Sequence, residues 1–192
     1  METTYIEIDS PDKHLSDVLE EIPSNVILYK TLTGIGATYS EIKAQRHSII
    51  IEPNVPVIIG KCNSAKHKND NLLGVYEGVT TDRIIKYLGA SRGKYYKILT
   101  TPESFTKVKD AFLIFNGKIY NTCFLLIDEA HKTIKDVDYR SDIVLPMNDF
   151  FKFKGKALVS ATPLKFSDPR FEENGFSIIK IELHTITLRR LI

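Results

Sequence analysis

The sequence has no long apolar run, few cysteines and almost no excess of charge of either sign. No apolar stretch approaches the roughly 20 residues that a membrane-spanning helix needs. Residues 1–4 are acidic and polar rather than typical of a signal peptide. The two cysteines, Cys62 and Cys123, lie far apart, and Cys123 stands in an apolar stretch where a buried, reduced thiol is ordinary. We therefore expect no membrane association and a cytoplasmic location.

The balance of charges and the number of potential metal ligands further limit the classes of protein to which the chain can belong. The 26 basic residues are nearly balanced by 24 acidic ones, and a net charge of +2 does not by itself indicate nucleic-acid binding. Basic residues gather in residues 61–68 and, interleaved with tyrosines, in residues 92–97. Such segments can bind phosphates and stack bases, but solvated loops are the more common explanation. Cys62 and His67 lack the clustered Cys and His partners of a structural zinc site.

What the sequence does contain is an alternation of short apolar runs with segments of helical spacing. Its 192 residues, 43% of them hydrophobic, suffice for one compact domain with a core. The pattern predicts strands at residues 25–29, 48–51, 72–76, 96–99, 122–127 and 157–159. It predicts helices at residues 14–21, 81–88, 103–115 and 129–135. This alternation indicates an α/β domain with a mainly parallel sheet, helices on both faces and ligands at the carboxyl ends of the strands.

The last residues of the chain, 185–192, form an apolar segment that should pair with something. We therefore expect the chain to be part of a longer protein, although a short natural protein is the alternative.

A glycine-containing turn, Thr33-Gly34-Ile35-Gly36-Ala37-Thr38, follows the strand at residues 25–29. In a phosphate-binding loop of the form GxxxxGK[ST], backbone N–H groups surround the phosphates, the lysine reaches the outer phosphates and the hydroxyl binds magnesium. Here the two glycines fit the turn and Thr38 fits the hydroxyl, but Ala37 stands where the lysine belongs. Thr31 also replaces the first glycine. Taken by itself, the segment is better explained as a strand-to-helix turn without a ligand.

Two adjacent carboxylates, Asp128 and Glu129, follow the strand at residues 122–127. At this edge of a parallel sheet Asp128 would hold a magnesium ion, usually through water, and Glu129 would orient and deprotonate an attacking water. The alternative is structural, with Asp128 as a helix N-cap and Glu129 as a first-turn acid favoured by the helix dipole. Together, the loop and the acidic pair predict a nucleotide site that lacks its lysine.

Asp128-Glu129-Ala130-His131 spells DEAH, and over about residues 27–163 the chain resembles the first RecA-like domain of superfamily 2 helicases. Thr33 to Thr38 resembles motif I of that family, and residues 51–54, 99–103 and 158–163 resemble motif Ia, the Thr-Pro-Glu motif and motif III. The resemblance implies one RecA-like P-loop NTPase domain over residues 1–192. It also implies ATP and Mg²⁺ as cofactors and DNA or RNA as a partner.

The resemblance assigns roles by position. The nucleotide would contact Thr33, Gly34, Ile35, Gly36, Ala37 and Thr38. Thr38 and Asp128 would hold the metal, and Asp128 and Glu129 would be catalytic. Coupling between nucleotide and nucleic acid would involve His131, Ser160 and Thr162. Nucleic acid would contact Pro53, Asn54, Thr101, Pro102 and Glu103. Several of these residues also have structural explanations, as a helix start, a strand end or turn hydroxyls.

Two departures from the family pattern limit this function. The motif I lysine is absent, and so is the second RecA-like domain, which in the family supplies an arginine finger and closes the cleft. A lost charge-assisted contact costs roughly 1.5 to 3 kcal/mol, or about tenfold to more than a hundredfold in affinity. Lys30, just before the loop, and Lys165, just after motif III, are the nearest candidates to replace the lysine. A solvated surface position is the expectation for each of them.

We therefore expect the ATP-binding first domain of a helicase-like, nucleic-acid-dependent ATPase. It would work with a second RecA-like domain in cis or with a partner in trans, and residues 1–192 alone would be weakly active or inactive. The alternative is a non-catalytic nucleotide- or nucleic-acid-binding regulatory module that keeps the helicase fold but has lost ATP hydrolysis.

Overall fold

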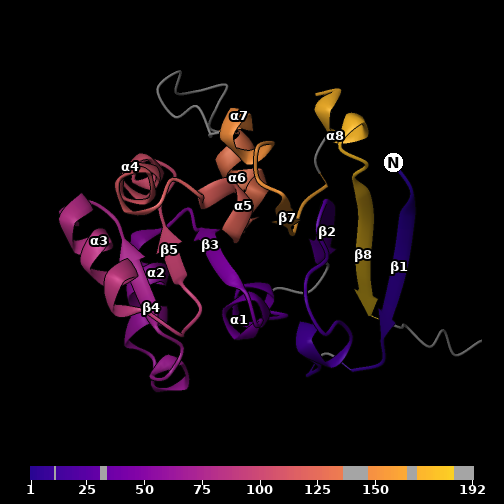
Figure 1. Ribbon diagram of the computed structural model, residues 1–192. Coiled ribbons are helices and arrows are strands. Elements are labelled where there is room, and N and C mark those ends of the chain that lie inside the picture. The colour runs from indigo at the N-terminus through magenta and orange to yellow at the C-terminus, as the bar shows by residue number, and fades with distance from the viewer. Residues whose placement is uncertain (11, 31–33, 136–146, 164–167, 184–192) are drawn as a thin grey trace, which may run out of the picture.

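The computed structural model describes the chain apart from residue 11 and residues 31–33, 136–146, 164–167 and 184–192 (Figure 1). Its centre is one eight-stranded sheet in the order β1-β8-β2-β7-β6-β3-β5-β4, and every pair of neighbouring strands is parallel. The strands are β1 (Thr3–Ile8), β2 (Val26–Lys30), β3 (His47–Ile51), β4 (Leu72–Val75), β5 (Lys97–Thr100), β6 (Cys123–Ile127), β7 (Gly155–Ser160) and β8 (Ser177–Leu183). The edge strands β1 and β4 lie at opposite ends of the molecule in Figure 1.

Helices cover both faces of this sheet. They are α1 (Ala37–Lys43), α2 (Val55–Asn63), α3 (Thr81–Ala90), α4 (Phe105–Phe115), α5 (Ile119–Thr122), α6 (Ala130–Lys135), α7 (Met147–Phe150) and α8 (Arg170–Glu173), with short 3-10 turns η1 (Leu15–Asp17) and η2 (Ala65–His67). No helix in the described part of the chain is long and apolar enough to cross a membrane.

Two apolar cores, one on each face, follow from the alternation of side chains along buried strands. In β2, Ile27 and Tyr29 belong to the core that contains α3 and α4, whereas Val26 and Leu28 belong to the core that contains α1 and α2. Strands buried on both faces appear in the sequence as continuous apolar runs, which is why the sequence pattern predicted them. The α/β fold with a parallel sheet and helices on both faces is confirmed.

The outer strands and one helix differ from the sequence prediction. The six predicted strands correspond to β2 through β7, but β1 and β8 were not predicted. Residues 14–21 form only the turn η1 rather than a helix. Buried Leu15 is tied to the loop, because its N–H donates to the carbonyl of Ile35 at 2.8 Å. Glu20 and Glu21 would also stand unfavourably at the negative end of a helix over this segment. The apolar segment 185–192 lies outside the described residues.

The register of the central strands brings the predicted chemistry to one edge of the sheet. Ile51 of β3 lies beside Ile127 of β6, and Leu158 of β7 lies on the other side of Ile127. The backbone N–H of Asp128 donates to the carbonyl of Ile51 at 3.0 Å, which continues the ladder by one residue. The residues that follow β3 and β6 therefore stand side by side at the carboxyl edge.

Candidate functional site

Four buried polar side chains meet at the carboxyl edge of the central strands. Lys30 ends β2, Thr38 lies in the first turn of α1, Glu52 follows β3 and Asp128 follows β6. Each of the four residues exposes 7% or less of its surface. Burial of three ionisable groups at one place is costly unless they pair with one another, so their contacts define the site.

Lys30 is a buried cation that binds both members of the acidic pair. Its Nζ lies 2.9 Å from Oδ1 of Asp128 and 2.7 Å from Oε1 of Glu129. Burial by itself would lower the pKa of the Lys30 ammonium, but the two carboxylates outweigh burial and raise that pKa above its usual value. Lys30 is therefore charged at neutral pH, and the expectation that it is a solvated surface lysine is wrong. Lys165 lies outside the described residues.

The hydroxyl of Thr38 stands between two carboxylates. Its Oγ1 lies 2.5 Å from Oδ2 of Asp128 and 2.9 Å from Oε1 of Glu52. A hydroxyl has one hydrogen, so it can donate to only one of these oxygens at a time. Burial would raise the pKa of Asp128, but Lys30 and the Thr38 hydroxyl together lower it, and Asp128 remains a carboxylate. The loop hydroxyl and the aspartate of the acidic pair are thus in direct contact.

Glu52 is a site residue that the sequence reasoning missed. Its carboxylate also accepts a hydrogen bond from Nζ of Lys61, on α2. Burial and the neighbouring Asp128 raise the pKa of Glu52, against the opposing effect of Lys61. A signal was present, because Glu52 directly follows an apolar strand as Asp128 does, but within residues 51–54 only Pro53 and Asn54 were assigned a role.

The backbone of the loop has the conformation that its glycines permit. Gly34 and Gly36 both have φ of 85°, in the left-handed region where other residues are strained. Ile35 between them is buried, and Ala37 begins α1 with only 2% of its surface exposed. Position 37 is therefore an apolar, buried position in this chain. Thr33 lies outside the described residues.

Glu129 has a strained backbone and the most accessible carboxylate of the cluster. Its φ is 51°, which is uncommon for a residue other than glycine and costs on the order of 1 kcal/mol or more. Its N–H donates to Oδ1 of Asp128 at 2.8 Å, and its side chain, 24% exposed, also faces His131 and Lys132 at 3.5 and 3.9 Å. The bend turns the Glu129 carboxylate to Lys30 and leaves part of it open to solvent.

The three residues assigned to coupling form one chain of contacts. Nδ1 of His131 lies 3.1 Å from Oγ of Ser160. The Ser160 hydroxyl donates to the carbonyl of Thr162 at 2.6 Å and accepts from its N–H at 3.1 Å. His131 also faces Glu129, so the ends of β6 and β7 are connected through side chains.

The residues assigned to nucleic-acid contact follow the neighbouring strands β3 and β5 at the same edge. Asn54 and Glu103 are exposed, and Pro53 and Pro102 are partly buried. Thr101 is buried, and its Oγ1 accepts from the N–H of Ser104 at 3.4 Å, as at a helix start. The five residues thus lie at the same edge of the sheet as Glu52 and Asp128. Their contact with nucleic acid stays a prediction.

Apart from Lys61, which binds Glu52, the described residues of the two basic segments do not join this site. His67 is buried and its Nδ1 lies 2.7 Å from Asp70. The ring of Tyr96 stacks on His47, at the amino ends of β3 and β5. Residues 92–97 therefore lie at the opposite edge of the sheet from Lys30 and Asp128.

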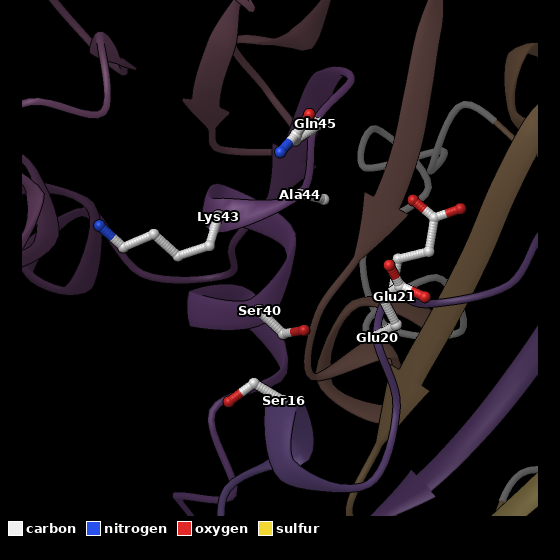
Figure 2. A pocket seen from close by; sticks show the side chains of 7 residues that line it. All are labelled: Ser16, Glu20, Glu21, Ser40, Lys43, Ala44 and Gln45. Carbon is white, nitrogen blue, oxygen red and sulfur yellow. The ribbon is translucent and has the colours of Figure 1, made fainter.

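A hollow of about 360 Å³ beside α1 is also separate from the cluster. Figure 2 shows its lining, which consists of Ser16, Glu20, Glu21, Ser40, Lys43, Ala44 and Gln45. The Lys43 side chain extends away from Glu20 and Glu21, and its Nζ binds Asp70 at 2.7 Å. Lys30, Thr38, Glu52, Asp128 and Glu129 do not line this hollow. The hollow therefore gives no information about the chemistry at the carboxyl edge.

The donor set suits a magnesium–nucleotide complex better than a bare metal ion. Among the residues that the structure describes, no group of three or more His, Cys, Asp or Glu residues is arranged to hold a metal. Magnesium usually takes one or two carboxylates, with phosphate oxygens and waters completing its shell. The crowded oxygens of Thr38, Asp128 and Glu52 fit that partial set.

Comparison with known proteins identifies the fold. No family model and no curated protein matches the chain. Among solved structures, it is similar to the Hef helicase domain of Pyrococcus furiosus, with a TM-score of 0.54 and 13% identity over 84% of this chain and 35% of that one. It is also similar to a DEAD box protein from Methanococcus jannaschii, with a TM-score of 0.52 and 20% identity over 82% of this chain and 45% of that one.

A third similar structure is a hypothetical ATP-dependent RNA helicase from Sulfolobus tokodaii, with a TM-score of 0.50 and 18% identity over 82% of this chain and 48% of that one. The chain thus spans from about a third to about half of the length of the structures that it matches. At these identities the likeness concerns the fold. The chain has a RecA-like fold, as the helicase domains of these structures do.

Proposed function

We propose that this chain is the ATP-binding first domain of a helicase-like, nucleic-acid-dependent ATPase. The observation that carries the proposal is the direct contact between the Thr38 hydroxyl and the Asp128 carboxylate. These are the two groups that hold magnesium in the RecA-like domains that the chain resembles. The helicase fold of the similar structures supports the same function.

In this proposal each residue of the cluster has a defined task. Thr38 and Asp128 would hold the metal ion, which when bound supplies positive charge to the phosphates and to the charge that develops during transfer. Glu129 would accept a proton from the attacking water, and its partly exposed carboxylate suits that task. Through their hydrogen bonds, His131, Ser160 and Thr162 would transmit a change at the nucleotide site to the end of β7.

Hydrolysis would need groups that residues 1–192 do not supply. The family resemblance places an arginine finger on a second RecA-like domain, in cis or in trans. Single-stranded nucleic acid would then bind near Asn54 and Glu103, which are exposed beside the cluster.

A regulatory module without hydrolysis is the second candidate, and two observations favour it. Ala37 is buried where the family carries its lysine, and Glu129 is paired with Lys30. Such a module would bind ATP or nucleic acid through the same residues without turnover.

Calorimetric titration of Mg-ATP into wild-type protein and a Thr38→Val variant tests the proposal. The substitution keeps the shape of the side chain but removes the hydroxyl, so we expect about tenfold weaker Mg-ATP binding and little change for ATP in EDTA. Ser40→Ala, which removes a buried hydroxyl from the same helix, is the matched control and should stay within about twofold of wild type. Equal Mg-ATP affinities for wild type and Thr38→Val would contradict the proposed site.

A second measurement separates the two candidates. Phosphate release is followed with and without single-stranded DNA and RNA, using a chain that includes any second domain of the natural protein. Stimulated release supports the ATPase, whereas nucleotide binding without release supports the regulatory module.

A further inference from the structure

Motif I lacks the positive charge of its lysine, and the role of that charge rests on the proposed nucleotide site. In a phosphate-binding loop the lysine follows the last glycine, and that position holds the buried Ala37. If this edge binds a triphosphate, another cation must meet its outer oxygens, because charge-assisted contacts give much of the affinity for phosphate.

Lys30 is the buried lysine that faces the acidic pair in the described part of the chain. Lys132 also approaches Glu129, but at 3.9 Å and with half of its side chain exposed. Lys61 is engaged with Glu52. Lys30 differs from both because it contacts Asp128 and Glu129 together at hydrogen-bond distance.

The position of Lys30 relative to the loop supports a role at the phosphates. Lys30 Nζ binds Oδ1 of Asp128, and the Thr38 hydroxyl binds Oδ2 of the same carboxylate. The ammonium and the loop hydroxyl are therefore separated by the width of one carboxylate group. A lysine at the end of β2 thus delivers its charge beside the start of α1, which is where a lysine at position 37 would begin.

The charge balance of the cluster explains how Lys30 could change partners. Three carboxylates, those of Glu52, Asp128 and Glu129, face two ammonium groups at hydrogen-bond distance, those of Lys30 and Lys61, while the exposed Lys132 stays more distant. In this arrangement two carboxylates meet the three N–H donors of the Lys30 ammonium. When Asp128 faces a magnesium ion instead, Lys30 loses a partner of opposite charge and its ammonium becomes available to a phosphate oxygen.

We propose that Lys30 supplies the cation missing from motif I. In the nucleotide-free protein it neutralises Asp128 and Glu129, and with Mg-ATP bound it turns to the outer phosphates of the nucleotide. The same contact regulates the site, because Glu129 is held by Lys30 until a phosphate competes for that lysine.

Mg-ATP affinity of Lys30→Met, measured by calorimetry, is the first test. Methionine keeps much of the length and apolar volume of lysine and removes its charge, so we expect affinity to fall by about tenfold to a hundredfold. Lys132→Met, which removes a lysine that faces the same carboxylate from an exposed position, should change affinity by less than about twofold. A folded Lys30→Met protein with wild-type affinity would overturn the proposal.

Relocation of the lysine separates a phosphate-binding role from a structural one. The double variant Lys30→Met/Ala37→Lys places the charge at the usual position of the loop and should recover most of the lost affinity. A lysine that only neutralises buried carboxylates would instead affect the unfolding midpoint, and folded Lys30→Met would keep its affinity. If the folded double variant binds Mg-ATP no better than Lys30→Met does, the exchange of Lys30 from carboxylates to phosphates is contradicted.

The wild-type protein provides a test that does not depend on the stability of a variant. The ammonium of Lys30, followed by nitrogen-15 NMR of its side chain, should shift when Mg-ATP is added and much less when MgCl₂ alone is added. An unchanged Lys30 signal in Mg-ATP-saturated protein would refute the proposal. Absence of any Mg-ATP binding to the wild type would instead contradict the proposed function itself, so the two failures are distinguishable.

Discussion

The two ends of helix α1 each carry a buried network of charged side chains, and the two networks are built differently. At its start, Thr38 lies among Asp128, Glu52 and Lys30. At its end, Glu41 is completely buried and pairs with the guanidinium of Arg46. Comparison of these networks separates charge that holds the fold together from charge that is available to a ligand.

The network at the end of α1 is closed. Arg46 donates to both carboxylate oxygens of Glu41, at 3.0 and 2.6 Å, and the Ser48 hydroxyl adds a third contact at 2.5 Å. Lys97 Nζ donates to the carbonyls of Glu41 and Ala44 and to Ser48, at 2.7, 2.8 and 3.0 Å. The N–H groups of the Lys97 ammonium cap the end of the helix, because they satisfy carbonyl groups that have no partner within the helix.

The network at the start of α1 has three carboxylates and two ammonium groups at hydrogen-bond distance, and it stays partly open. One hydroxyl serves two carboxylates, and Glu129 is held in a strained backbone with a quarter of its side chain exposed. A network that only stabilised the fold would gain nothing from this backbone strain. The difference is the one expected if the closed network stabilises the fold and the open one receives a cation, such as the magnesium ion of the proposed nucleotide site.

The largest expected effect is on stability at the closed end. Glu41→Gln removes the charge of the fully buried member of the pair and leaves the partly buried Arg46 without its main carboxylate partner, and breaking a buried pair costs about 3–5 kcal/mol. Urea unfolding should show this loss, while Mg-ATP affinity of the folded protein should be unchanged. Glu20→Gln, an exposed glutamate near the same helix, is the control and should change stability by less than about 0.5 kcal/mol. A loss below 1 kcal/mol for Glu41→Gln would break the distinction between the two ends.

The next effect is on ligand binding at the open end. Asp128→Asn removes the charge that faces both Lys30 and Thr38, so the gain in ATP affinity on replacing EDTA by Mg²⁺ should be lost, about tenfold or more. Asp149→Asn is the matched control, because Asp149 is also ion-paired, to Lys109 at 2.6 Å, but belongs to α7. A magnesium effect that survives in Asp128→Asn would remove this aspartate from the site.

The central sheet could be predicted from the sequence because its strands are buried on both faces. Runs such as Cys123–Ile127 are apolar without interruption, and glycines marked the loop at Gly34 and Gly36. The edge strand β1 (Thr3–Ile8) is mostly exposed and lacks a continuous apolar run, so it was missed although the alternation of Ile6, Glu7 and Ile8 is typical of a strand. β8, which pairs with β1 and β2, was missed with it.

The candidate site was only partly visible in the sequence. Asp128 and Thr38 could be placed because each belongs to a recognisable motif. The roles of Lys30 and Glu52 depend on which strands are neighbours, and the order β2-β7-β6-β3 is not contained in any local pattern. For the same reason burial of Lys30 could not be foreseen, since an isolated lysine at a strand end is usually solvated.

The smallest expected effect is a pH dependence of stability at the closed end. Burial, only partly offset by Glu41, lowers the pKa of Lys97 from 10.5 to about 8. Between these values the unfolded chain holds a proton that the folded chain has lost, so the free energy of unfolding should rise with pH in this window, by about 1 kcal/mol per unit. Urea unfolding at pH 8 and pH 9 should show this increase, and Lys97→Met should abolish it.

Lys86→Met, the same change at an exposed position on α3, should keep the slope. A slope that persists in folded Lys97→Met would mean that Lys97 remains charged across this window. In that case its three acceptors would compensate the buried ammonium completely. The closed network would then resemble the open one, where Lys30 stays charged because two carboxylates face it. The pH slope therefore measures whether carbonyl and hydroxyl acceptors can replace carboxylates as partners of a buried lysine.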